Sequence, residues 1–82
     1  MTAIPEPGPE LYWDATYAIA VALTAQYPTL VPDRIGLAEL ARLVEALPDF
    51  RDDPALANER ILADIQITWY EERAYQYKEA VN

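Results

Sequence analysis

The sequence contains no cysteine, no histidine and no serine, and it has only two glycines. Without thiols or imidazoles, the chain has no means to form a disulfide, a thiolate-held iron–sulfur cluster, a zinc site of the usual kind or a histidine acid–base pair. The missing serine excludes the commonest hydroxyl nucleophile, and the two glycines form no phosphate-binding loop. Composition therefore disfavours an enzyme and favours a protein that acts by binding.

Positive charge is also scarce, because six basic residues stand against fourteen acidic ones and the formal net charge is −8. Nucleic-acid binding needs a positive field, so this balance argues against it and favours a basic partner or a hard cation. The same charge favours a monomer. No apolar run approaches the roughly 20 residues of a membrane span, and residues 1–10 do not have the pattern of a signal peptide. We therefore expect a cytoplasmic protein with no membrane association.

The 82 residues suit one small domain, and 52% of them are hydrophobic, which is too many for a disordered chain of this charge. Residues 1–10 hold three prolines and a glycine, which predicts a flexible N-terminal segment. We place a single helical domain at residues 11–78 and a short tail at residues 79–82. Scarce glycine and the lack of alternating β-branched residues favour an all-α fold of three short helices.

Apolar residues at helical spacing predict the first two helices. The first covers about residues 14–26, with Asp14 as its N-cap and Thr16 as the alternative. The second covers about residues 37–47, and Pro48 ends it. Each helix presents one apolar stripe, so each is expected to bury one face in a shared core.

The third helix has the strongest pattern, beginning after a good N-cap residue, Asn58, and continuing less regularly to about residue 78. Its apolar stripe includes Trp69, which we therefore place in the core. Trp13 precedes the first helix and is predicted to pack back onto it as a hydrophobic staple. Tyr75 lies past the regular pattern, where an exposed helix end is favoured over a partner contact.

Four acidic residues lie close together in the sequence, three of them in one loop: Asp49, Asp52, Asp53 and Glu59. Oxygen-only groups of this kind suit Mg²⁺, Ca²⁺, Mn²⁺ or iron, although the spacing does not match the twelve-residue calcium loop. From the residues alone, a solvated acidic surface is the favoured interpretation and a weak, unselective metal site is the alternative. Phe50 is the one large hydrophobe of the loop and is expected to anchor it in the core.

The run from Phe50 to Leu62 is the most specific part of a longer pattern. It carries Asp52-Asp53-Pro54 and Asn58-Glu59, and it is colinear with three flanking landmarks, which are Trp13, Tyr27-Pro28 and Trp69. Over about residues 11–72 the chain resembles the IscX family, whose members are small acidic proteins of bacterial iron–sulfur cluster assembly.

This resemblance implies a small helical domain similar to a modified winged helix. It also implies an accessory role, in which family members dock through acidic surface on the cysteine desulfurase of the assembly machinery and bind iron weakly. We accordingly expect no catalytic residue, no tightly bound cofactor, and weak binding of Fe²⁺ or Fe³⁺ by Asp49, Asp52, Asp53 and Glu59. The residues predicted to contact the partner are Asp49, Asp52, Asp53, Glu59, Asp64, Asp33 and Glu39.

Departures from the family pattern bear on these expectations. Thr29 and Val31 stand where the family carries acids, and Arg51 replaces an acid in the loop. They weaken the iron expectation more than the docking expectation, because docking depends on the summed charge. Two alternatives remain open, namely a hard-cation module acting as an iron donor and a generic acidic protein-interaction domain.

Overall fold

The computed structural model describes the backbone of residues 10–81 and the side chains of residues 10–76, so the predicted flexible segment 1–10, apart from Glu10, lies outside the described residues. The elements in chain order are α1 (Thr16–Gln26), the 3₁₀ turn η1 (Pro32–Arg34), α2 (Leu37–Glu45), a second 3₁₀ turn η2 (Pro54–Leu56) and α3 (Glu59–Val81). Within the described residues, β-type pairing is confined to a single bridge between Leu11 and Phe50. The predicted all-α fold is confirmed.

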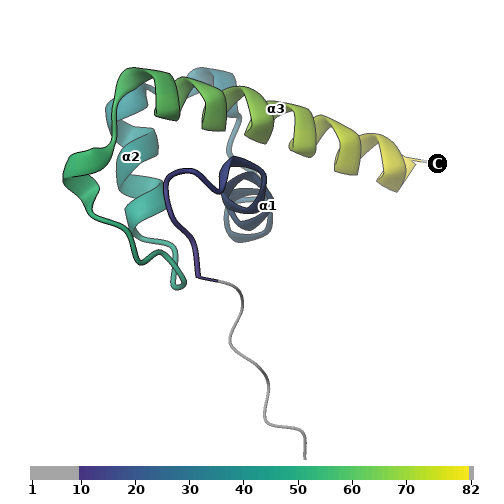
Figure 1. Ribbon diagram of the computed structural model, residues 1–82. Helices are drawn as coiled ribbons and strands as arrows, with labels where there is room; N and C mark the ends of the chain where they lie inside the picture. Colours follow the sequence, from purple (N-terminus) through teal and green to yellow (C-terminus); the bar gives the residue numbers. More distant parts are fainter. Residues whose placement is uncertain (1–9, 82) are drawn as a thin grey trace, which may run out of the picture.

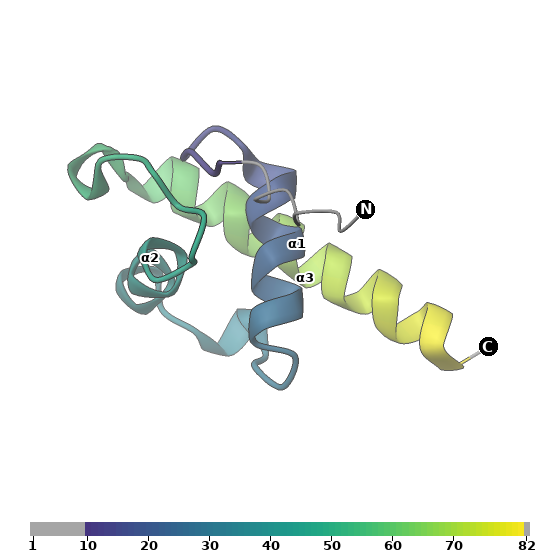
Figure 2. The same ribbon diagram turned by 90° about the horizontal axis from the view of Figure 1, so that it is seen from below.

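The three helices surround one core (Figure 1). In that view α3 lies across the top, α1 is seen end-on beneath it, and α2 stands to the left. The turned view shows that α1 crosses α3 and that the second half of α3 extends past α1 (Figure 2). None of the described helices, α3 included, is both long and apolar enough to cross a membrane.

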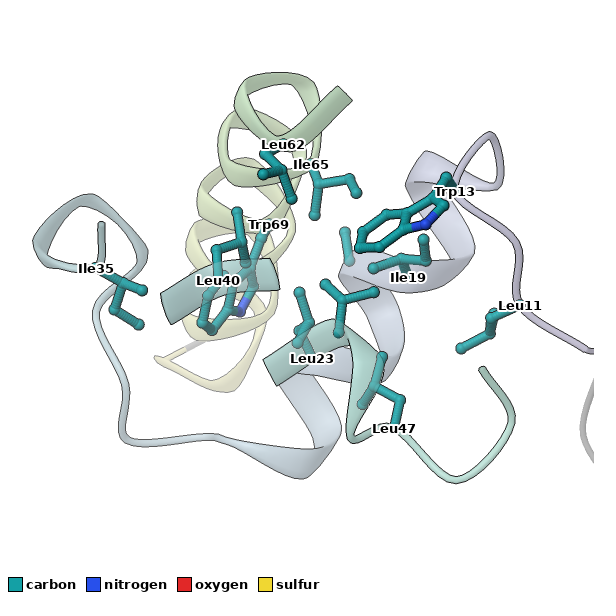
Figure 3. Close-up of a cluster of buried hydrophobic side chains, with 12 residues drawn as sticks. Leu11, Trp13, Ile19, Leu23, Ile35, Leu40, Leu47, Leu62, Ile65 and Trp69 are labelled. Carbon is teal, nitrogen blue, oxygen red and sulfur yellow. The ribbon is translucent and has the colours of Figure 1, made fainter. Parts of the chain in front are cut away.

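The core draws on all three helices and on the chain before α1 (Figure 3). The predicted stripes are confirmed by burial of Ile19 and Leu23 on α1, and of Leu40 and Val44 on α2. Ala20 of α1 is also fully buried and adds a methyl group to this core. The core residues of α3 are Leu62, Ile65 and Trp69.

The predicted start of the first helix is wrong, because α1 begins at Thr16 with Ala15 as its N-cap and has no side-chain cap. Instead, a turn closed by the Ala15 amide donating to the Tyr12 carbonyl (2.9 Å) leads the chain into the helix. This turn follows a segment that is fixed by distant residues, described below, so the entry into α1 does not depend on Asp14.

The end of α2 and the start of α3 are set by local hydrogen bonds. α2 ends at Glu45, two residues before the predicted end, and the Leu47 amide then donates to the Val44 carbonyl (3.0 Å) in a closing turn. Asn58 Oδ1 accepts a hydrogen bond from the Ile61 amide (2.9 Å), which confirms it as the N-cap of α3. α3 runs to Val81, beyond the predicted end near residue 78.

Candidate functional site

The acidic loop, defined here as residues 48–54, is paired with the chain that precedes α1. The Leu11 amide donates to the Asp49 carbonyl (2.8 Å), and the Arg51 amide donates to the Leu11 carbonyl (2.9 Å). Leu11 is buried, so both hydrogen bonds lie against the core. The loop is therefore a fixed part of the fold.

Trp13 holds the second half of the loop. Its backbone amide donates to Asp52 Oδ2 (2.9 Å), and its indole Nε1 donates to the Asp53 carbonyl (2.8 Å). Trp13 as a whole is 3% exposed, and its indole ring meets Phe50 edge-on, with ring centroids 4.8 Å apart and planes at 69°. The expected loop anchor, Phe50, packs against the core as predicted. Trp13 is not simply a staple on the first helix, because it ties that helix entry to the acidic loop.

Two of the predicted site carboxylates shape the loop themselves. Asp52 accepts the Trp13 amide on one oxygen and the Asp53 amide (2.7 Å) on the other. Asp53 caps η2, because its Oδ1 accepts the Ala55 amide (2.9 Å). Asp53 is exposed and Asp52 is half-exposed, so both still contribute negative charge to the surface.

The other predicted residues fall into two groups. Glu59, in the first turn of α3, and Asp64, further along it, are exposed, whereas Asp49 is half-buried. These three lie on the loop or on the helix that follows it. Asp33 instead lines a hollow on the side of α3 together with Gln66 and others, and Glu39 is exposed in the first turn of α2. We call Asp49, Asp52, Asp53, Glu59 and Asp64 the loop-and-helix surface.

The arrangement does not form a preorganised metal centre. Within the described part of the chain, no three acidic side chains gather as a group able to hold a metal ion. Both oxygens of Asp52 and one of Asp53 already accept backbone hydrogen bonds, which hard cations would have to share or displace. Iron binding by Asp49, Asp52, Asp53 and Glu59 stays a prediction.

Sequence reasoning missed Gln66, which joins α3 to the turn before α2. Its Nε2 donates to the Pro32 carbonyl (2.9 Å) and to the Ile35 carbonyl (2.8 Å). A side-chain amide carries two N–H donors, so one residue satisfies both carbonyls. The only signal in the sequence is a glutamine directly beside the apolar stripe of the third helix.

Nearby carboxylates raise the pKa of two tyrosines. The Tyr12 hydroxyl donates to Glu10 (2.5 Å), and this hydrogen bond and the Glu10 charge raise the pKa of Tyr12. The pKa of Tyr17 is raised by a hydrogen bond to Glu72 and then by the charge of that carboxylate. The second pair joins α1 to α3 far along the chain from the acidic loop.

Comparison with known proteins gives these features a context. Residues 11–74 match the family described as Iron-sulphur cluster assembly. The chain is also similar to Uncharacterized protein PA3808 of Pseudomonas aeruginosa, with 38% identity over 63 residues, which covers 77% of this chain and 96% of that protein. The matched residues include the Leu11–Trp13 segment, the acidic loop and the start of α3. The chain therefore belongs to the IscX family of iron–sulfur cluster assembly.

Proposed function

We propose that this protein is an accessory factor that docks through its loop-and-helix surface on the cysteine desulfurase of the iron–sulfur assembly machinery. Membership of the assembly family supports a role in iron–sulfur cluster assembly. The acidic loop, held in place by Trp13, supports docking through acidic side chains. An acidic surface attracts a basic partner and raises the rate of encounter more than it raises the final affinity. Regulation of the partner then follows from occupying its surface.

The observation that carries this proposal is the pairing of the acidic loop with Leu11 and Trp13. Because that pairing fixes the loop backbone, the carboxylates around it are held in one arrangement before a partner arrives. Preorganisation lowers the entropy lost on binding. Residues 49–64 include five acidic residues and only two basic ones, Arg51 and Arg60, so the net charge of this stretch is negative.

The test should change the surface without touching the hydrogen bonds of the loop. The double variant Glu59→Lys/Asp64→Lys reverses two exposed charges on α3. Its matched control is Asp14→Lys/Glu45→Lys, which makes the same change in net charge at two exposed positions outside this surface. Affinity for the desulfurase would be measured at low and at physiological salt, with a spectrum of each free variant to show that it is folded.

We expect the surface variant to bind roughly tenfold more weakly at low salt and the control to change by less than about threefold. The difference should shrink at physiological salt, where the Debye length is about 8 Å. Equal weakening by both variants would mean that only the total charge matters. Unchanged binding by the surface variant would refute this docking surface.

A further inference from the structure

A hollow of about 380 Å³ lies between the first turn of α1 and the second half of α3, lined by Tyr17, Thr68, Glu71, Glu72 and Tyr75. The two tyrosines are among the most exposed large hydrophobic residues of the chain, at 64% for Tyr17 and 62% for Tyr75. The acidic loop precedes the start of α3, whereas this hollow uses the half of α3 that extends past α1 (Figure 2).

The lining combines two phenol rings with two carboxylates. Glu72 is half-buried, and Gln76 Nε2 donates a hydrogen bond to Glu72 Oε2 (2.8 Å). That hydrogen bond orients the Glu72 carboxylate and leaves its remaining lone pairs free to accept others. Adjacent negative charges repel an anion, while aromatic faces attract a cation. The chemistry of the hollow therefore suits a cationic group that carries an apolar stem.

We propose that this hollow is a second contact site, which receives an arginine side chain from a partner protein. A guanidinium group is planar, stacks on aromatic faces and donates two parallel hydrogen bonds to one carboxylate. An ammonium group is a point charge that holds its water more strongly, so lysine fits this lining less well. The phenol rings would cover the stem and face of the guanidinium, and Glu72 with Glu71 would balance its charge.

The site is separate from the docking surface proposed above. The match to the assembly family ends at residue 74, and Tyr75 lies just beyond it. The hollow also shares no residue with the loop-and-helix surface. Its test needs no desulfurase, so either proposal can fail without the other.

The test uses the full isotope-labelled chain and a capped Gly-Arg-Gly peptide as the probe. A second peptide with citrulline in place of arginine has nearly the same shape and no charge. We expect the arginine peptide to shift the amide signals of Tyr17 and residues 68–76 with millimolar affinity. The citrulline peptide should bind at least roughly fivefold more weakly, in line with a cation–π contact supported by a carboxylate.

Two variants and their controls locate the site. Tyr75→Leu should weaken arginine binding roughly threefold, whereas Tyr70→Leu, at an exposed tyrosine of the same helix that lines a different hollow, should change it little. Glu72→Gln should weaken it roughly fivefold, and Asp64→Asn, at an exposed acid of the same helix, by less than twofold.

Four results would overturn the proposal. Equal binding of the citrulline peptide would show that the charge is not recognised. Shifts centred on the acidic loop, or equal effects of Glu72→Gln and Asp64→Asn, would show a general response to the acidic field. Binding of a Gly-Lys-Gly peptide as tight as that of the arginine peptide would remove the assignment to arginine.

Discussion

Removing the Asp52 carboxylate should destabilise the domain more than its place in an acidic surface loop suggests. Asp52→Ala deletes the acceptor for two backbone amides, those of Trp13 (2.9 Å) and Asp53 (2.7 Å). Hydrogen bonds to a charged acceptor contribute about 1.5–3 kcal/mol each, but Asp52 is half-exposed and water replaces part of each bond. We expect a loss of about 2 kcal/mol in the free energy of unfolding.

Thermal unfolding followed by circular dichroism measures this loss. In a domain of this size, each kcal/mol lowers Tm by about 4–8 °C, so Asp52→Ala should lower Tm by about 8–16 °C. Asp64→Ala is the matched control, because it removes the same charge from an exposed position and should change stability by no more than about 0.5 kcal/mol. Asp52→Asn keeps one carbonyl oxygen as an acceptor and should fall between the two.

Hydrogen exchange adds a readout that a general loss of stability does not give. In Asp52→Ala the Trp13 amide should exchange much faster relative to the amides of the α3 core, because its acceptor is gone. Equal Tm values for Asp52→Ala and Asp64→Ala would refute the structural role of Asp52. Unchanged relative protection of the Trp13 amide would refute the hydrogen bond from that amide to Asp52.

Three further predictions follow from single contacts. Asn58→Ala should lower the free energy of unfolding by about 1 kcal/mol and Asn58→Gly by a few tenths, because glycine tolerates the N-cap position, as chemical denaturation would show. Gln66→Ala removes two hydrogen bonds and should cost about 2 kcal/mol in the same assay. Gln76→Ala removes one hydrogen bond, to Glu72, at an exposed position and should cost much less. Glu72→Gln should lower the pKa of Tyr17 towards its ordinary value of 10.0 in a ¹³C NMR titration. Folding raises the pKa of Tyr17, so protonated Tyr17 adds to the free energy of unfolding below pH 10.0, and this addition is lost as the pH rises through the pKa of the folded protein. In Tyr17→Phe the free energy of unfolding should therefore fall less steeply over that pH range.

The helices and most of the core could be predicted because their signals are local. The apolar stripes that bury Ile19, Leu40 and Ile65 repeat at helical spacing, and the Asn58 cap contacts an amide only three residues away. Helix starts without a side-chain signal could not be predicted in this way. α1 begins at Thr16 because distant hydrogen bonds fix the preceding chain, which overrides the local capping preference of Asp14.

The two tryptophans also show that sequence patterns predict local features and miss contacts between distant segments. Sequence periodicity placed Trp69 in the core, where it is fully buried, since it lies on the strongest stripe. Trp13 has no such periodic context, and its two acceptors lie 39 and 40 residues away. Figure 3 shows Trp69 on the side of the cluster nearer Ile35 and Trp13 on the side nearer Leu11, with Ile65 between the two indoles. Periodicity reveals the residues of one helix and carries no information on pairing between segments so far apart.

The acidic residues show why this limit matters for function. In the sequence, Asp52 and Asp53 look equivalent to Glu59 and Asp64, and reversing the first pair to lysine looks like a direct test of docking that leaves the domain folded. In the structure, the first pair folds the loop through backbone hydrogen bonds, while the second pair is exposed. Weakened binding after reversal at Asp52 and Asp53 would therefore mix a lost contact with a displaced loop. Reversal at Glu59 and Asp64 leaves those hydrogen bonds in place, so only that pair tests the surface itself.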